Sequence, residues 1–392
     1  MQKQLYIFNP ENDLALASGT KNYTAPAHAS QLRSDLQLLP LWYANYPCHI
    51  LAKCNKENLQ YVEMIRHKLP RIGAVDIGNV SNGNYHVQPW GWSAAILSEL
   101  IRMGINCPLS FDDAKHLRDI SHRRISIYVF QWLKRNYPNI PLPETPCLCH
   151  TFSEIEGASQ RFKDMIAKVP WSGSGRGICR MKNENLPIYK IWAEGILKKQ
   201  GALICEKYLD KLQDFAMEYY VEKGRARFAG FSIFYNTPQM SYDHAIVTTS
   251  EKSEHILKTK YFMQAGIEID TVKKAMSECL ISFLPCEYVG YVGVDMMAYR
   301  TNGNQIAINP CIEVNLRATM GVVSAALGDR VVHPDKIGTM SILYHPTETD
   351  LIAAKSKWKE AVFKDGFLYE GTLSLVPITD NTRYTATLAV AE

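Results

Sequence analysis

A lysine followed at once by a glycine-rich loop is the strongest chemical signal in the sequence. The segment Lys168–Ile178 reads KVPWSGSGRGI and holds three glycines and two serines. Glycines let backbone N–H groups close around phosphate oxygens, and a lysine supplies a compact positive charge beside them. The segment fits neither GxxxxGK[ST] nor GxGxxG in its strand-to-helix setting. The pattern indicates phosphate binding, and a surface loop without a ligand is the alternative.

Two acids and an asparagine occur in apolar, strand-like segments nearer the C-terminus. Asp295 lies in YVGVDMMAYR, and Glu313 and Asn315 lie in INPCIEVNL. Glu313 and Asn315 project from the same face of a strand because they are two residues apart. Buried carboxylates need a cation, and Mg²⁺ held by carboxylate and amide oxygens together with ATP phosphates would supply one. The alternative is a salt-bridged acid pair at a sheet end, with Arg317 as the partner.

Together these segments resemble the ATP-grasp superfamily, in which a lysine precedes a glycine-rich lid, a hinge strand carries a glutamate, and an aspartate and an E-x-N motif bind metal. The same order is present here: Lys168, the lid Ser172–Gly177, Glu206 in ICEKYL, Asp295, and Glu313-Val-Asn315. The resemblance spans about residues 115–330, and the combined order is more specific than any single motif. It implies a two-lobed fold with ATP between the lobes and Mg²⁺ as the second cofactor.

The resemblance also implies a role for each matching residue. Adenine would pair with backbone groups of the hinge residues Glu206, Lys207, Tyr208 and Leu209. The phosphates would lie against Lys168 and the lid residues Ser172, Gly173, Ser174, Gly175, Arg176 and Gly177. The metal would be held by Asp295, Glu313 and Asn315.

Three further positions match the superfamily less directly. Its ribose is met by an acid several residues past the hinge, for which Asp214 is the best match and Asp210 the alternative. A second lysine, at a helix start before the lid, is replaced here by Arg123, whose planar guanidinium is no equivalent of an ammonium. A solvated charge at a helix end is the other interpretation of Arg123. Arg317 stands where many ligases of the superfamily place an arginine near the transferred phosphate.

The first loop of the chain is a candidate acceptor site. LYIFNP has the pattern of a strand, followed by a loop over Asn9–Asp13 and a short helix over LALA. Glu11, Asn12 and Asp13 are the candidate substrate residues. The two acids would receive the ammonium of an amine, while Arg317 would hold a carboxylate or acyl phosphate by a bidentate contact. The alternative is that Asn12 or Asp13 only caps the helix.

Strands alternating with helices must position this loop. CHILAK and YHVQP are strand candidates, and SAAILSELIRMGI has helical spacing after the N-cap candidate Ser93. The alternation predicts an open α/β domain over residues 1–115, with ligands at the carboxyl ends of its strands. That rule points to the loops Asn9–Asp13 and Pro89–Trp92.

Further along, the pattern changes to an α+β arrangement. A helix over residues 121–135 stops before the proline-rich connector YPNIPLPETP. A helix over FSEIEGASQRFKDMI, a strand into Lys168, a helix over IYKIWAEGILKKQ and a strand at ALICEKYL follow. The strand-like runs FAMEYYVEK, RARFAGFSIFY, YVGVDMMAYR and INPCIEVNL come next. We predict a first lobe at 116–205, a second lobe at 206–335, and a C-terminal segment at 336–392 with no readable motif.

Composition narrows the class of protein. A formal charge of +4 over 392 residues, without a basic stripe, implies neither nucleic acid nor a membrane surface as a partner. No secretory signal and no apolar run of roughly 18 residues is present, so we expect a cytoplasmic protein with reduced thiols. Cys147, Cys149 and His150 lack a second pair at zinc-binding spacing. A homodimer is the default expectation for the assembly.

The expected activity is an ATP-dependent ligase that joins a small-molecule carboxylate to an amine through an acyl phosphate. Such a site needs Mg²⁺, Lys168 and Arg317 around the transferred phosphoryl group rather than a covalent nucleophile. The alternatives are a kinase acting on a hydroxyl and an ATP-binding protein without turnover. Release of ADP with a stable phosphorylated product would identify the kinase. The sequence does not name the substrates, because fold and nucleotide site do not encode them.

Overall fold

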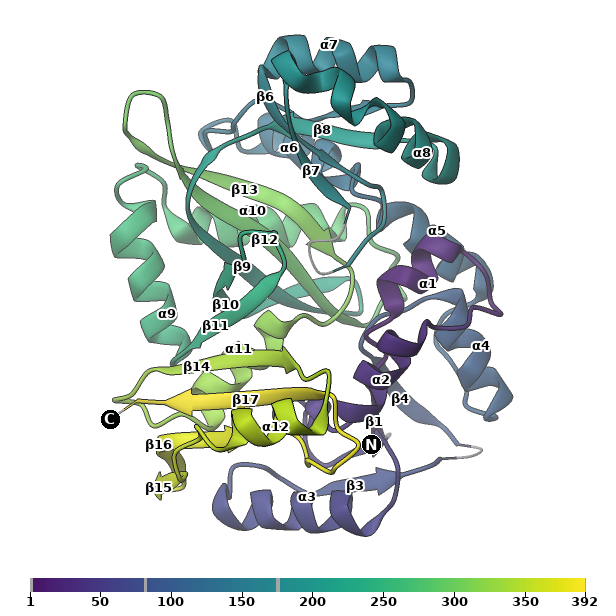
Figure 1. Cartoon of the computed structure of the whole chain (residues 1–392), viewed down its shortest axis with the longest axis vertical. Helices are drawn as coiled ribbons and strands as arrows, with labels where there is room; N and C mark the ends of the chain where they lie inside the picture. The colour runs from purple at the N-terminus through teal and green to yellow at the C-terminus, as the bar shows by residue number, and fades with distance from the viewer. Residues whose placement is uncertain (1–2, 81–82, 174–176, 392) are drawn as a thin grey trace.

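The N-terminal part of the computed structural model folds as a four-stranded parallel sheet, in the order β3-β2-β1-β4 (Figure 1). The structure describes residues 3–80, 83–173 and 177–391. The strands are β1 (Lys3–Ile7), β2 (Cys48–Leu51), β3 (Val75–Gly78) and β4 (Tyr85–Pro89). The helices beside them are α1 (Asn12–Ser18), α2 (Ala27–Asp35), α3 (Lys56–Lys68) and α4 (Ala94–Arg102). The predicted open α/β domain is confirmed, and β3 is a strand that the pattern did not reveal.

A nine-stranded antiparallel sheet forms the centre of the molecule, in the order β13-β12-β9-β10-β11-β14-β17-β16-β15. Its first five strands are β13 (Ile306–Asn315), β12 (Gly290–Arg300), β9 (Asp210–Glu222), β10 (Arg225–Asn236) and β11 (Tyr242–Val247). The last four come from the C-terminal segment: β14 (Gly338–Tyr344), β17 (Tyr384–Val390), β16 (Phe367–Ser374) and β15 (Val362–Lys364). Residues 336–392 therefore extend the sheet that carries Asp295 and Glu313.

A small four-stranded sheet, β5-β8-β6-β7, lies at one end of the molecule under α7 and α8 (Figure 1). It consists of β5 (Cys147–Cys149), β8 (Leu203–Lys207), β6 (Asp164–Lys168) and β7 (Ile178–Lys182), covered by α7 (Phe152–Phe162), η2 (Asn183–Tyr189) and α8 (Lys190–Gln200). The helix predicted over 152–166 ends earlier, at Phe162. Lys163 has a φ of 65°, and the following residues pair with β7 and β8.

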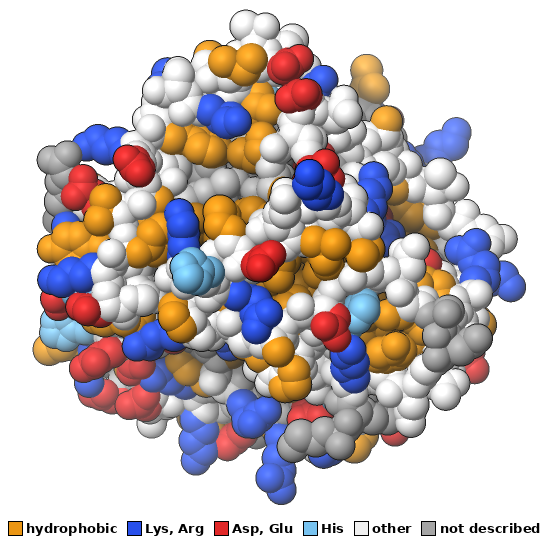
Figure 2. All heavy atoms as spheres, turned by 90° about the horizontal axis from the view of Figure 1, so that it is seen from below, with side chains coloured by type: hydrophobic (Ala, Val, Ile, Leu, Met, Phe, Trp, Pro, Cys, Tyr) orange, Lys and Arg blue, Asp and Glu red, His pale blue; other side chains and the backbone are white. Residues whose placement is uncertain are grey.

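The remaining helices pack on the central sheet and between the parts. They are η1 (Leu39–Trp42), α5 (Phe111–Ile120), α6 (Ile125–Asn136), α9 (Ser250–Leu257), η3 (Lys258–Phe262), α10 (Ile269–Ile281), α11 (Met320–Arg330) and α12 (Glu348–Lys355). The helix expected over 121–135 is α6, which begins at Ile125. Charges of both signs are mixed over the face seen in Figure 2. No helix in the described ranges is long and apolar enough to span a membrane.

Alternation along β9 separates a core face of the central sheet from a polar face. Phe215, Met217 and Tyr219 are buried in a core that also includes Leu5 and Ile7 of the N-terminal sheet. The intervening residues of β9 point to the opposite face, because successive side chains of a strand alternate. That opposite face carries the predicted site.

Candidate active site

Two neighbouring strands bring Asp295, Glu313 and Asn315 onto the polar face of the central sheet. Asp295 on β12 lies directly opposite Glu313 on β13, and Asn315 lies opposite Gly293. Antiparallel register places directly opposed side chains about 4.5–5.5 Å apart at Cβ. Asp295 and Glu313, which are 18 residues apart in numbering, are therefore adjacent in space. The expectation that Glu313 and Asn315 share a face is met, because no bulge interrupts β13 between them.

The electrostatics of this group fit a divalent cation. Burial and the neighbouring Glu313 raise the pKa of Asp295 to about 7. Asn315 Nδ2 donates to Asp295 Oδ2 at 3.1 Å. Two carboxylates side by side are costly when both are ionised, and a hard cation bound by oxygen ligands would remove that cost. No three His, Cys, Asp or Glu side chains gather for a metal anywhere in the described part of the chain. The candidate metal site therefore consists of the carboxylates of Asp295 and Glu313 and the amide oxygen of Asn315.

Arg123 is the partner of Glu313, and it also holds the start of the lid. Its Nε donates to Glu313 Oε1 at 3.0 Å and its Nη2 to Glu313 Oε2 at 3.2 Å. Its Nη1 donates to Val169 O and to Ser172 Oγ, at 3.0 and 2.7 Å. Although burial raises the pKa of Glu313, the charge of Arg123 lowers it below the ordinary value. The solvated interpretation of Arg123 is wrong, because only 5% of the residue is exposed.

Lys168 lies at the end of β6, as predicted, and it is buried. Its Nζ pairs with Glu206 Oε1 at 2.6 Å and donates to Ile312 O on β13 at 3.3 Å. The lysine therefore joins the small sheet to the central sheet beside the acids. Of the predicted lid, Ser172, Gly173 and Gly177 are described, whereas Ser174, Gly175 and Arg176 lie outside the described residues. Gly177 has a φ of 72°, and a Cβ there would lie 2.4 Å from Val169, so a glycine is required.

The predicted hinge is the passage from β8 to β9. Glu206 and Lys207 end β8, and Tyr208 and Leu209 join it directly to the central sheet. Tyr208 N donates to Asp164 O at 2.9 Å, and Lys207 Nζ donates to Glu144 at 2.8 Å. The segment thus connects the small sheet to the central sheet.

Of the two ribose candidates, Asp214 lies on the site face and is buried. Its Oδ2 accepts from Lys211 Nζ at 2.5 Å and from Asn236 Nδ2 at 2.8 Å. The side chain of Asp210 is 73% exposed. The geometry favours Asp214 over Asp210 as a ligand-facing acid.

Arg317 follows Asn315 and pairs with the first loop of the N-terminal domain. Its Nε donates to both oxygens of Asp13 at 3.0 Å, and its Nη2 lies 2.9 Å from Asp13 Oδ2. Its strand segment is fixed by Ala318 N, which donates to Trp90 O at 2.7 Å. Both loops that the carboxyl-edge rule singled out therefore contact the segment around Arg317. The proposed Arg317–Glu313 salt bridge is wrong, since these two residues pair with Asp13 and Arg123.

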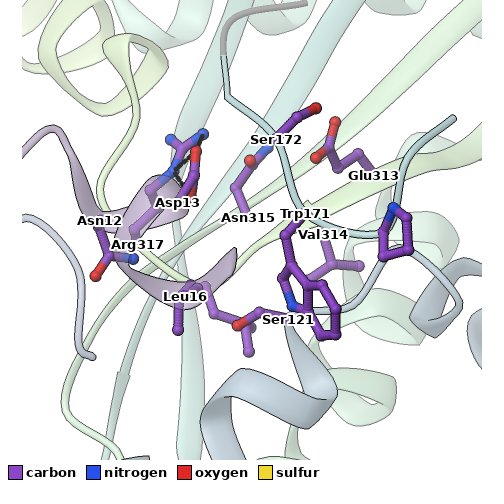
Figure 3. A pocket seen from close by; sticks show the side chains of 12 residues that line it. Asn12, Asp13, Leu16, Ser121, Trp171, Ser172, Glu313, Val314, Asn315 and Arg317 are labelled. Carbon is purple, nitrogen blue, oxygen red and sulfur yellow. Dashed lines mark hydrogen bonds and ion pairs between the residues drawn. The ribbon is translucent and has the colours of Figure 1, made fainter. Parts of the chain in front are cut away.

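Figure 3 shows the side chains that line the narrow cavity where these groups meet, Ser172 and Trp171 among them. Its free volume is ≈ 20 Å³, room for about one water molecule. Arg317 and Asp13 lie on one side and Glu313 on the other, with Asn315 between them. The ion pairs of Arg317 and Glu313 thus lie on opposite sides of this small space.

Asn12 lines this cavity and Glu11 precedes it in the chain, and the side-chain cap expected of Asn12 or Asp13 is not formed. Glu11 occupies the N-cap position of α1 without any side-chain capping bond. Its Oε1 pairs with Arg33 at 2.9 Å. Asn12 is buried, and its amide nitrogen reaches Gly91 O at 3.0 Å when the amide is oriented to satisfy its hydrogen bonds. The interpretation that Asn12 or Asp13 merely caps the helix is therefore wrong.

Glu218 is a buried acid on the same face that the sequence analysis missed. Its Oε1 accepts from Thr319 Oγ1 at 2.8 Å, and its Oε2 has no partner among the described residues. Burial raises its pKa to about 8. A Cβ on Gly321 would lie 2.0 Å from Oε1, so that glycine makes room for the carboxyl group. The sequence could have indicated it, because Glu218 and Asp214 are four residues apart on one strand and therefore project from the same face.

Comparison with known proteins tests the fold. No protein-family model matches the chain, and no curated protein matches it in sequence. Biotin carboxylase from Campylobacter jejuni, in a β-γ-ATP complex, aligns over 100% of this chain and 88% of its own, with a TM-score of 0.51 and 10% identity. N5-carboxyaminoimidazole synthetase from Staphylococcus aureus, complexed with ADP, aligns over 100% and 94%, with a TM-score of 0.49 and 12% identity. The first likeness confirms the resemblance to the ATP-grasp fold.

Proposed function

We propose that this chain is an ATP-dependent ligase that joins a small-molecule carboxylate to an amine through an acyl phosphate, with Mg²⁺. The observation that carries the proposal is the meeting of Lys168, Asp295, Glu313 and Arg317 where the small sheet, the central sheet and the N-terminal domain converge. Phosphoryl transfer needs positioned cations and a metal rather than a protein nucleophile. The biotin carboxylase with the same fold forms a complex with β-γ-ATP, which is consistent with a nucleotide where the small sheet and the central sheet meet.

Each group has a definite task in this proposal. The hinge Glu206–Leu209 binds the adenine through its backbone, and Asp214 accepts from the ribose. Lys168 and the lid hold the phosphate oxygens by charge-assisted hydrogen bonds. Asp295, Glu313 and Asn315 hold Mg²⁺, which would neutralise charge on the phosphates.

Arg317 is placed for the acyl end of the reaction. Arg317 lies two residues after Asn315 in the chain, and its guanidinium pairs with Asp13 of the N-terminal domain. A guanidinium can bind a carboxylate or an acyl phosphate with two parallel hydrogen bonds, so it can hold the carboxylate substrate in line with the transferred phosphoryl group. The ion pair between Asp13 and Arg317 keeps the guanidinium in this position.

The proposal is tested by a substrate screen. Purified protein with MgATP is incubated with pairs of small carboxylates and amines, and release of ADP and phosphate is measured alongside mass spectrometry of the products. A ligase releases both ADP and phosphate only when both substrates are present, and an amide product appears. A stable phosphorylated product without free phosphate would identify a kinase instead. Failure to bind ATP by equilibrium titration would refute the nucleotide site itself.

A further inference from the structure

A second cavity, of ≈ 540 Å³, lies wholly within the N-terminal domain. It is lined by the loop after β1, the segment Lys21–Ala25, and residues of α1, α2 and α4. The strand order β3-β2-β1-β4 places β1 between β2, which follows it in the chain, and β4 on the other side. Ligands of open α/β sheets bind outside the carboxyl ends of the strands where the order reverses. This cavity lies at that point, between the loops that follow β1 and β4.

The less exposed part of the cavity lining has an excess of negative charge. Arg33 Nη1 donates to Glu11 Oε1 at 2.9 Å, and Arg33 Nη2 donates to Glu99 Oε1 at 2.7 Å. Two carboxylates thus share one guanidinium. The second oxygen of Glu11 is buried and has no hydrogen-bond partner in the described ranges. A buried acceptor without a donor is costly, so this oxygen is available to accept from a ligand, and a cationic donor would also balance the charge.

The more exposed part of the same lining has positive charge. Lys21 and Arg102 line it, and both residues are exposed. Neither forms an ion pair with another described residue; Arg102 Nε donates only to Ser98 O, at 3.2 Å. An anionic group is the ligand chemistry that such a pair of cations recognises. The lining therefore offers a partly buried acid for a cationic group and two exposed cations for an anionic group.

The two cavities are neighbours. Asn12 lines both, and it stands between Glu11 in this cavity and Asp13 in the pair with Arg317. A group bound at Glu11 is therefore next to the place where the acyl phosphate would lie in the proposed reaction. We propose that this cavity binds the amine substrate, and that this substrate is a zwitterion, an amino acid or short peptide. Its amino group lies on Glu11 and its carboxylate near Lys21 and Arg102. This inference rests on the proposed ligase function.

The test measures binding by calorimetry without nucleotide, so that it does not depend on turnover. The probes are L-alanine, L-glutamate and L-alanyl-L-alanine, each also in an N-acetylated and a C-amidated form. We expect at least one unmodified probe to bind and each modification to weaken it about tenfold or more, the effect of losing one charge-assisted hydrogen bond. Glu11→Gln should remove the penalty for N-acetylation, and a Lys21→Ala/Arg102→Ala double variant should remove the penalty for C-amidation.

Matched variants elsewhere serve as controls. Glu63→Gln on α3 and Lys198→Ala on α8 change exposed residues outside both cavities, and they should leave every affinity unchanged. Ala25→Trp would fill the cavity and should abolish binding of the probes although Glu11 is intact. This variant tests the cavity if Glu11→Gln does not fold. The proposal is overturned if no unmodified probe binds, or if Glu11→Gln retains the discrimination against N-acetylation. ATP titration of the same samples is a separate measurement. If ATP binds and none of the amino acid or peptide probes does, the cavity assignment is refuted while the nucleotide site stands.

Discussion

Replacing Arg123 with methionine should destabilise the ligand-free protein more than the loss of any surface arginine. Arg123 donates to Glu313, Val169 and Ser172, and its side chain is only 4% exposed. Methionine fills a similar volume but leaves Glu313 without its cation. Breaking a buried pair from one side costs about 3–5 kcal/mol. The side chain of Glu313 is 22% exposed, so water screens part of this loss and we expect about 3 kcal/mol.

A double-mutant cycle separates the pair from the other contacts of Arg123. Arg123→Met, Glu313→Gln and the double variant should give a coupling free energy of about 2 kcal/mol, because the double variant leaves no unpaired buried charge. The matched control is Arg180 with Asp164, a bidentate pair with bonds of 3.0 and 2.6 Å. Its side chains are 41% and 32% exposed. For that control, coupling of about 1 kcal/mol or less is expected.

The assay is urea unfolding followed by tryptophan fluorescence and far-UV circular dichroism, in buffer without nucleotide or metal. Free energies are compared only where the two probes give coincident transitions, as a two-state treatment requires. Equal coupling in the two cycles would show that burial adds nothing to the Arg123–Glu313 pair. The charge assignment of the site would then be wrong.

Three other changes test separate parts of the site. Lys168→Met should weaken ATP binding about tenfold or more by removing charge-assisted bonds to phosphate, measured by titration with a fluorescent ATP analogue, and unchanged affinity would exclude Lys168 from the site. Glu313→Gln should lower the rate of ADP release about 10²-fold, measured at saturating ATP. Burial raises the pKa of Glu218 from its ordinary 4.5 to about 8, so the unfolded chain loses this proton first and stability falls as pH rises from about 4.5 to about 8. Glu218→Gln should remove that fall, on the order of 3–5 kcal/mol, and an unchanged pH dependence of unfolding would disprove the assignment.

Local patterns predicted the elements that hold the site, but not the partners of its charges. The alternation around Asp295 and Glu313 correctly predicted two strands, and Lys168 was correctly placed at a strand end. Arg123 precedes Glu313 by 190 residues, so no local pattern connects them. The pairing follows from how α6 packs on β13, which is a tertiary effect.

The predicted end of the helix over 152–166 was wrong because its last residues are compatible with two structures. The residues DMI fit the end of a helix as well as a strand, because periodicity cannot separate these in three residues. In the structure they belong to β6, where cross-strand pairing with β7 and β8 decides the outcome. The C-terminal segment had no readable motif, and yet it supplies four strands, since adding strands to an existing sheet needs only alternation and no chemical signature.

Removal of Mg²⁺ should weaken nucleotide binding more than it would in a site lined only by cations. Lys168, Arg123 and Arg317 are each already paired with an acid, namely Glu206, Glu313 and Asp13, and Asp295 adds a further carboxyl group. The triphosphate of metal-free ATP would therefore meet three cationic side chains whose charges are already neutralised by acids. Mg²⁺ bound by Asp295 and Glu313 would compensate those two acids, release Arg123 and reduce the charge of the nucleotide. We therefore expect ATP affinity in EDTA to fall about tenfold or more relative to MgATP. In Glu313→Gln the dependence on Mg²⁺ should shrink. Equal affinity with and without the metal, measured by calorimetry, would show that Asp295 and Glu313 do not hold it.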